Sequence, residues 1–325
     1  MSVLVYAENS AGKFKKSTYE AVSYGNAIAK AIGGTLTVVS IGEVDNAELQ
    51  NLSKYGARKV YDVKGDKVQK FVTQPYASSI AEVAQKEGAK VIVISNSFSG
   101  KSVAPRVAVK LKAGLVAGAV DVPQTASGFT VKKTSFSGKA FSHVSILGDV
   151  KVITLNPNSY KVNEDPGSAE VISFTPNLSE TDLKVTVKDI TKASDKIALP
   201  EAERVVSAGR GMKGPENWKM IEELADILGA ATACSKPVSD AGWRPHSEHV
   251  GQTGIAISPN LYIAIGISGA IQHLAGISSS KVIVAINKDS EAPFFKVADY
   301  GIVGDAFEVV PKLIEALKKF KANLN

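Results

Sequence analysis

The stretch that decides the fold runs from Val250 to Asp305 and reads VGQTGIAISPNLYIAIGISGAIQHLAGISSSKVIVAINKDSEAPFFKVADYGIVGD. It holds two short apolar runs rich in β-branched residues, at 261–267 and 281–286, and each is bounded by Gly, Ser or Asn. Such runs are typical of buried parallel strands. A third run, at 301–305, closes the stretch. We therefore expect a parallel sheet here, flanked by helices as in doubly wound α/β folds.

A glycine turn joins the first two of these strands. Gly266 and Gly269 permit a tight turn, and we expect Ser268 to cap the helix that follows. A strand, a glycine turn and a helix N-terminus together aim backbone N–H groups and a positive dipole end at one point, which suits a phosphate. The glycines could equally serve the turn alone, because their spacing is not that of a G-x-G-x-x-G fingerprint.

Two further features favour a bound nucleotide. In the run Gly251-Gln252-Thr253-Gly254 the glycines let the backbone approach a ligand, while the two polar side chains offer donors and acceptors. Polar residues also stand at the ends of the later strands, including Asn287 and Asp305. In a doubly wound sheet the carboxyl ends of the strands face the ligand crevice.

An arginine between glycines lies upstream, at Arg210, directly after an expected strand at 204–207. Its guanidinium fork matches phosphate oxygens, so it is a good pyrophosphate ligand, although a surface salt bridge would use the same residue type.

The ordered segments VGQTG, LYIAIGISGAIQH, IVAINKD, EAPFF and VADYGIVGD resemble the FAD domain of the electron-transfer flavoprotein alpha subunit. The resemblance runs in register from about residue 205 to about residue 320 and is looser upstream, as in SNSFSGKSVAPRVAVKLKAGLV. It implies a FAD-carrying subunit that forms a heterodimer with a beta subunit, which itself binds AMP in many members and a second FAD in electron-bifurcating ones.

The same resemblance implies an electron carrier. Its electrons would come from flavin dehydrogenases, such as the acyl-CoA dehydrogenases of fatty acid beta-oxidation, and pass to a quinone reductase or another acceptor.

The resemblance also implies a set of cofactor-binding residues in the second domain. They are Arg210, Ser235, Lys236, Val250, Gly251, Gln252, Thr253, Ser268, Gly269, Ala270, Ile271, Gln272, His273, Asn287, Asp305 and Ala306. Three of them would tune the flavin: Lys236 over the ring, Thr253 at N5 and His273 near the C2 carbonyl. Asn287, Asp305 and Ala306 match the adenosine end.

Three of these positions or their neighbours depart from the family pattern. Lys236 stands where the family has an arginine, so it keeps the charge but loses the planar fork. Ile255 replaces the lysine that usually follows GQTG, and Ala306 replaces a leucine.

Composition sets the wider bounds. The chain has 325 residues, 44% hydrophobic and 22% charged, which is enough for two domains with separate cores. The net charge of +6 is mild and the lysines are scattered, which argues against nucleic acid but suits steering of an acidic protein partner. The single cysteine, Cys234, excludes an internal disulfide and a cysteine-ligated cluster within the chain. With no leader pattern and no apolar run of about 18 residues, we expect no membrane insertion and a cytoplasmic protein.

Upstream of residue 123 the pattern alternates between strand and helix, which predicts a first, nucleotide-binding-like α/β domain with a mainly parallel sheet. The expected strands lie at 3–7, 35–40, 59–63, 91–95 and 115–120, and the clearest helix at 18–32. Residues 127–157, including Val152 and Ile153, predict antiparallel strands at the sheet edge. We expect an exposed loop at 156–176, a last strand at 183–190 and a linker at 194–200, so that the domains span 1–193 and 201–325.

Two other motifs have plain interpretations. The loop around Gly100-Lys101-Ser102 resembles a P-loop ending but lacks its first glycine, so we expect a turn, or a subunit contact. His246 and His249 have a spacing that could suit a metal, but no acidic cluster accompanies them. We expect a surface loop there and no metal site.

The sequence shows no recognisable nucleophile–base pair, metalloprotease motif or carboxylate dyad. A site of cofactor contacts alone suits electron carriage, where the flavin is both acceptor and donor. Two alternatives stay open at this point: a self-sufficient FAD- or NAD-dependent oxidoreductase, and a redox-inert nucleotide-binding module.

Overall fold

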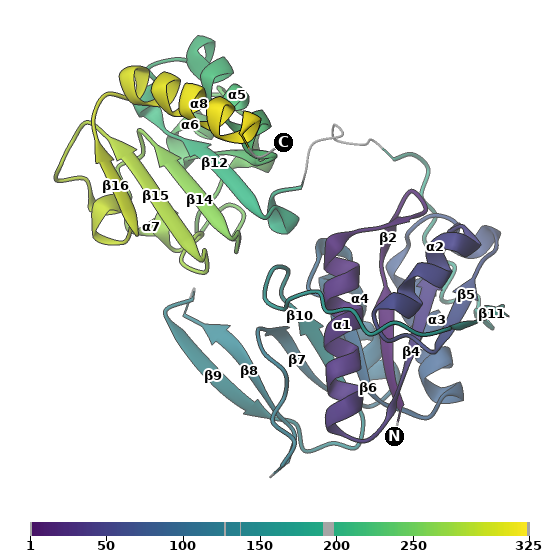
Figure 1. Cartoon of the computed structure of the whole chain (residues 1–325). Coiled ribbons are helices and arrows are strands. Elements are labelled where there is room, and N and C mark those ends of the chain that lie inside the picture. The colour runs from purple at the N-terminus through teal and green to yellow at the C-terminus, as the bar shows by residue number, and fades with distance from the viewer. Residues whose placement is uncertain (1, 127, 137, 191–197, 324–325) are drawn as a thin grey trace. The chain divides into compact units, whose positions relative to one another are not determined.

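The chain folds into two compact α/β units, each described here by itself (Figure 1). The computed structural model describes residues 2–126, 128–136, 138–190 and 198–323. The first unit comprises Met1–Ser135 and Ala140–Thr191, and the second includes Lys192–Asn325. The domain limits expected from the sequence, 1–193 and 201–325, stay a prediction. Within the expected linker, residues 194–197 lie outside the described part of the chain.

A nine-stranded sheet forms the centre of the first unit, in the order β11-β5-β4-β1-β6-β10-β7-β8-β9. The first seven strands in that order are mutually parallel, and the last two form an antiparallel hairpin. The strands are β1 (Ser2–Ala7), β4 (Thr35–Ile41), β5 (Lys59–Val63), β6 (Ala89–Ser95), β7 (Gly114–Ala119), β8 (Thr130–Ser135), β9 (Ala140–Ser145), β10 (Lys151–Leu155) and β11 (Glu170–Phe174). A separate small ladder joins β2 (Asn9–Ser10) to β3 (Lys13–Phe14).

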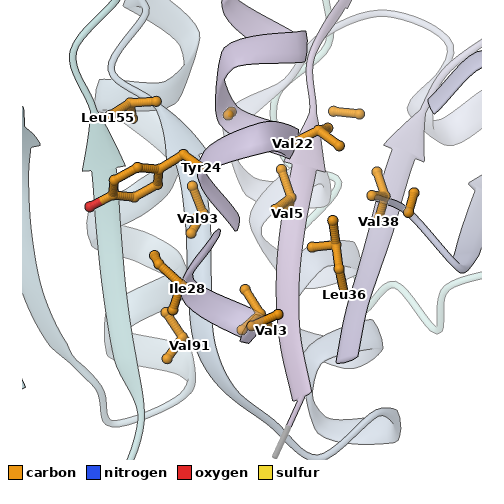
Figure 2. Close-up of a cluster of buried hydrophobic side chains, with 14 of the residues drawn as sticks. Val3, Val5, Val22, Tyr24, Ile28, Leu36, Val38, Val91, Val93 and Leu155 are labelled. Carbon is orange, nitrogen blue, oxygen red and sulfur yellow. The ribbon is translucent and has the colours of Figure 1, made fainter. Parts of the chain in front are cut away.

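Helices cover both faces of this sheet because alternate residues of each strand point to opposite sides. On one face Val3 and Val5 pack against Tyr24 and Ile28 of α1 (Lys16–Ala31), as Figure 2 shows. On the other face the intervening strand residues pack against α3 (Thr73–Lys86) and α4 (Phe98–Lys110). A short α2 (Asn46–Asn51) lies between β4 and β5 in the chain. Each fully buried aliphatic side chain contributes roughly 1.5–3 kcal/mol to the free energy of folding. The two buried clusters therefore hold the helices on the two faces of the sheet.

Two strand predictions and one loop prediction in the first unit are wrong. Residues 152 and 153 belong to β10, which is not an antiparallel edge strand but a parallel strand between β6 and β7. The segment expected as exposed loop contains β11, which pairs in parallel with β5. Residues 183–190, expected as the last strand, form no strand. For β10 and β11 pairing with a distant strand decides the outcome, because short runs of five residues gain little from local preference.

The loop around residue 100 is the start of α4. Ser97 caps the helix by accepting a hydrogen bond from the N–H of Gly100 at 2.9 Å, and its own hydroxyl donates to a carboxylate oxygen of Glu8 at 2.5 Å. A Cβ on Gly100 would lie 1.8 Å from the carbonyl oxygen of Ser95, so only glycine fits. The expected turn at residues 100–102 is therefore wrong, because these residues belong to the first turns of α4.

The second unit is built on a five-stranded, fully parallel sheet in the order β13-β12-β14-β15-β16. The strands are β12 (Arg204–Ala208), β13 (Ala231–Cys234), β14 (Leu261–Ile265), β15 (Val282–Asn287) and β16 (Tyr300–Val303). Helices α5 (Lys219–Leu228) and α8 (Ala306–Ala322) pack side by side on one face (Figure 1). Helix α5 ends at Gly229, which has the left-handed φ of 58°.

Loops and short helices cover the other face of this sheet. They include α7 (Ile271–Leu274), and the buried cluster on this face contains Tyr262 and Phe294. Ile255, one of the departures noted above, packs against this cluster as a partly buried side chain. The short α6 (Lys236–Asp240) lies on the face of α5 and α8, where its Val238 joins their buried cluster. The two-domain α/β class with mainly parallel sheets is thus confirmed. Among the described residues, no helix is both long and apolar enough to cross a bilayer.

Candidate functional site

A cavity of about 610 Å³ opens in the second unit beyond the carboxyl ends of the strands. Its walls come from the segments that follow β12, β13, β14 and β15 and from the loop before β14. The lining residues are Arg210, Ser235, Lys236, Pro237, His249, Val250, Gly251, Gln252, Thr253, Gly266, Ile267, Ser268, Ala270, Gln272, His273, Asn287 and Asp289. This is the place where open α/β sheets hold their ligands.

A second cavity, of about 410 Å³, adjoins the first and shares three of its residues, Arg210, Gly266 and Asn287. Its other lining residues are Gly211, Lys213, Ile286, Lys288, Asp305 and Ala306. Both volumes are in the range of small-molecule and cofactor pockets. The shared residues make the two cavities one elongated space with Arg210 at the junction.

The structure brings together most of the residues expected at the site. Two expected residues, Gly269 and Ile271, line neither cavity. Gly269 has a φ of +88°, and a Cβ on it would lie 2.5 Å from the backbone nitrogen of Phe294, so it serves the turn. Ile271 begins α7 and its side chain is 63% exposed.

Backbone contact fixes the junction of the two cavities. The N–H of Gly211 donates to the carbonyl of Gly266 at 3.1 Å, and the N–H of Gly266 donates to the carbonyl of Ile286 at 2.9 Å. A Cβ on Gly211 would lie 2.6 Å from the Cα of Gly266. The arginine loop and the turn after β14 therefore meet without side chains between them, which places Arg210 at a defined point.

The expected cap of the next helix is wrong. The residue before α7 is Ala270, no side chain caps the helix, and α7 is a single turn of four residues. Ser268 instead lies in the turn, and its carbonyl accepts from the N–H of Phe294 at 3.1 Å. The turn needs the positive φ of Gly266 (60°) and Gly269 (88°), which moves the N-cap position two residues beyond Ser268, to Ala270.

Lys236 begins α6 and lines the first cavity. Its ammonium lies 2.7 and 2.9 Å from the two carboxylate oxygens of Asp240, one turn later in the same helix. This hydrogen-bonded lysine lowers the pKa of Asp240. The side chain of Lys236 is 56% exposed, so its charge is both partly paired and partly solvated.

His273 is buried on α7 and lines the cavity. Its Nε2 lies 2.8 Å from the phenol oxygen of Tyr262 on β14. Burial lowers the pKa of His273 to about 4, and the nearby His249 acts in the same direction. The imidazole is therefore neutral at pH 7 and offers one donor and one acceptor.

His249 was expected in a surface loop, and this is wrong. The residue is 5% exposed and lines the first cavity. His246, by contrast, is exposed, and its Nδ1 lies 3.0 Å from the hydroxyl of Ser239. No cluster of three or more metal-ligating side chains occurs in the part of the chain that the structure describes. The segment between β13 and β14 carries no hydrophobic pattern that separates the buried histidine from the exposed one.

Two lysines of the second cavity escaped the sequence analysis. Lys213 and Lys288 line it beside Arg210, while the carboxylate of Asp305 lines it too and caps α8 by accepting from the N–H of Phe307 at 2.9 Å. Lys213 adopts a φ of 65° and its ammonium lies 4.6 Å from the ring centre of Phe307. Only their closeness to Arg210 and to the end of β15 along the chain could have indicated them.

The amide of Asn287 is used to hold the site together. Its nitrogen donates to the carbonyl of Ile267 at 3.0 Å, and its oxygen accepts from the N–H of Asp289 at 3.1 Å. The side chain thus ties the end of β15 to the turn after β14.

The residues present fit a dinucleotide cofactor. The first cavity is lined by backbone, apolar side chains, a lysine and two histidines whose pKa values are lowered. Such a lining suits a flat ring with polar groups at its edge. Three cations gather at and beyond the junction, which suits a pyrophosphate. The carboxylate of Asp305, which lines only the second cavity, suits a ribose. Fold and site together define an α/β protein that binds a nucleotide cofactor at the strand ends.

Comparison with known proteins gives the family. Residues 3–179 match the family described as electron transfer flavoprotein domain, and residues 198–278 match the electron transfer flavoprotein FAD-binding domain. The chain is 39% identical over 318 residues to the electron transfer flavoprotein subunit alpha of Bacillus subtilis (strain 168), covering 98% of this chain and 97% of that protein.

Other relatives agree. The electron transfer flavoprotein subunit alpha of Syntrophomonas wolfei is 39% identical, with 97% of this chain and 98% of that protein covered. Protein FixB of Clostridium saccharobutylicum is 35% identical, with 98% and 96% covered. The chain belongs to the electron transfer flavoprotein family, as an alpha subunit with a FAD-binding second domain.

Proposed function

We propose that the chain holds one FAD in the two adjoining cavities and shuttles electrons between flavin dehydrogenases and a downstream acceptor. The observation that carries this proposal is the convergence of the expected cofactor contacts on one elongated space, with Arg210 at its junction. In this reading the flavin ring occupies the cavity of His249 and His273, and the adenosine lies toward Asp305. When bound, FAD supplies the acceptor and donor of electrons.

Each group of residues has its own part in this proposal. Arg210, Lys213 and Lys288 neutralise the pyrophosphate, because they are the cations of the second cavity. Thr253, Lys236 and His273 contact the ring edge in the first cavity. Ser235, Val250, Gly251, Gln252, Ser268, Ala270 and Gln272 shape its walls.

We further propose that the chain works as a heterodimer with an electron-transfer flavoprotein beta subunit. The support is the family itself, whose matched relatives carry the name subunit alpha. Acyl-CoA dehydrogenases of fatty acid beta-oxidation are the proposed donors and a quinone reductase the proposed acceptor. The cytoplasm is the proposed compartment, and the single Cys234, buried and without a disulfide, is compatible with it.

The test is co-purification with the beta subunit, followed by denaturation and chromatography of the released cofactor. We expect one FAD per chain in the second domain's site. An Arg210→Ala variant should lose FAD, while Arg106→Ala, on the exposed face of α4, should retain it. Release of FMN, or a colourless complex, would contradict the proposed cofactor site.

A second measurement tests the electron path. An acyl-CoA dehydrogenase with its acyl-CoA should bleach the flavin of the complex, whereas acyl-CoA alone should not. Turnover of a small substrate without any protein partner would instead support a self-sufficient oxidoreductase.

A further inference from the structure

His249 lies inside the loop that carries Gln252 and Thr253. A Cβ on Gly254 would lie 2.8 Å from its Nδ1, and a Cβ on Gly251 would lie 3.4 Å from its Nε2. Both glycines therefore leave room for the imidazole. The loop closes around it, because the N–H of Ile255 donates to the carbonyl of His249 at 2.8 Å.

The loop is also tied to the sheet. The N–H of Val250 donates to the carbonyl of Cys234 at 3.0 Å, and the N–H of Gln252 donates to the carbonyl of Gln272 at 2.7 Å. The imidazole is thus held at the wall of the first cavity by backbone on both sides. What little surface His249 exposes includes the wall of that cavity.

Charged and titratable groups lie near the imidazole of His249 on each of the neighbouring segments. Burial and the ammonium of Lys236 lower the pKa of His249, the carboxylate of Asp240 raises it, and His246 lowers it. The remaining groups are the neutral thiol of Cys234, the ion pair of Arg244 with Glu248, His273 across the wall, and Arg210 and Asp289 on the same cavity. Because its pKa lies below the ordinary value of 6.5, His249 is neutral at pH 7 when the cavity holds no added negative charge.

We propose that His249 is the group beside the flavin that takes up a proton when the flavin in this cavity is reduced. The inference rests on the proposed function, since it places the flavin ring in the first cavity. The two electrons come from the dehydrogenase partner and the proton comes from solvent. A negative charge added to a buried space favours the protonated form of a neighbouring imidazole. The new imidazolium then compensates that charge.

His249 has one pKa when the flavin is oxidised and a higher pKa when it is reduced. These two values set the sign of the pH dependence of the flavin potential. Below both values the imidazole is charged throughout, and above both it stays neutral throughout. Between them, reduction binds one extra proton, so the flavin potential falls as the pH rises. A tenfold change in proton concentration then shifts a two-electron potential by about 30 mV.

The test is potentiometry of the FAD-loaded complex across pH 5 to pH 9 for the wild type, His249→Gln and His246→Gln. Glutamine keeps a polar side chain but does not titrate. We expect His249→Gln to lose a segment with an additional slope of about 30 mV per pH unit. His246→Gln removes a neighbour that lowers the pKa of His249 but leaves His249 in place, so its curve should keep the segment with the additional slope, displaced toward higher pH. A His249→Gln curve that matches the wild type overturns the proposal.

A second measurement needs no variant at His249. With histidine isotope labelling in this chain alone, the complex carries four labelled imidazoles. Those of His143 and His246 are assigned by glutamine substitution, and His273 by its low pKa. We expect the proton affinity of His249 to rise at least tenfold on reduction of the flavin, and an unchanged pKa overturns the proposal. A complex without FAD would contradict the proposed function instead, so the two failures are distinct.

Discussion

The phenol oxygen of Tyr262 lies 2.8 Å from Nε2 of His273, and both side chains are buried. Tyr262 belongs to β14 and His273 to α7, so the hydrogen bond joins the one-turn helix to the sheet. The ring of Phe294 stacks on Tyr262 at 6.2 Å, with an angle of 7° between the planes. The hydrogen bond to Tyr262 therefore helps to hold His273 at the cavity, together with Phe294, whose ring centre lies 5.9 Å from that of the imidazole.

Substitution of Tyr262 tests the contribution of that hydrogen bond. Tyr262→Phe leaves Nε2 of His273 buried and unpaired, and we expect the free energy of unfolding to fall by roughly 1–3 kcal/mol. Tyr300→Phe is the matched control, because that tyrosine is 67% exposed on the edge strand β16. Urea denaturation of the complex measures both. Equal midpoints for the two variants would show that the hydrogen bond does not stabilise the domain.

The low pKa of His273 predicts a loss of stability in acid. The folded-state pKa is about 4, below the ordinary value of 6.5, so the unfolded chain binds more protons between these values. Stability is complete above pH 6.5 and should decrease as the pH falls toward 4, by at most about 1.4 kcal/mol per pH unit from this group. His273→Gln should flatten the dependence and His246→Gln should not. Denaturation at pH 7 and pH 5 is the measurement.

The ion pair of Lys236 predicts two shifts of opposite sign. Lys236→Ala removes a positive charge beside the proposed flavin ring and should lower its reduction potential by several tens of millivolts, since about 1.4 kcal/mol corresponds to 59 mV for one electron. Asp240→Asn releases the ammonium from its partner at 2.7 Å and should raise the potential. Both side chains are about half exposed, so solvent screens their charges. We therefore expect both shifts in reduction potential to lie at the low end of several tens of millivolts.

Potentiometric titration of the two variants checks this prediction, with Lys236→Arg as a control that retains the charge. Potentials that stay at the wild-type value in Lys236→Ala, with FAD bound, would show that the lysine does not tune the flavin.

The glycine contact at the junction predicts a position-specific cost. Gly266 has a φ of +60°, and a Cβ on it would lie 2.8 Å from the Cα of Gly211. Gly266→Ala should therefore lose both the backbone preference, worth about 1 kcal/mol, and the packing of the two loops, worth roughly 1–3 kcal/mol. Gly242→Ala shares the positive φ of 71° but meets no atom within 4 Å, so it should lose the first part only. Thermal unfolding and FAD content compare the two.

Much of the fold could be predicted from the sequence where strands are long apolar runs. The strand at 59–63 has the predicted limits, because its buried residues Val60, Tyr61 and Val63 lie between turn residues. β10 and β11 could not be placed. Each has only five residues, and only the parallel neighbours β6, β7 and β5 make them part of the main sheet.

The site residues also divide into those that could be predicted from the sequence and those that could not. Residues at strand ends, such as Arg210 and Asn287, could be predicted because a parallel sheet gathers its carboxyl ends at one edge. The burial of His249 could not, since it depends on two glycines that fold the chain around the ring. Ser268 failed as a cap because the positive φ of Gly269 delays the helix.

The strand order of the second unit has a consequence for how FAD and folding are linked. The cavity walls follow β12, β13, β14 and β15, which pair in the spatial order β13-β12-β14-β15, so no single strand with the loop after it carries the pocket. Cofactor affinity is then an attribute of the completed sheet and absent from the unfolded chain. Free FAD at 100 times its dissociation constant should shift the unfolding equilibrium by about 2.7 kcal/mol. The yellow colour of the protein would thus report on the integrity of the whole domain, far beyond the few side chains that touch the ring.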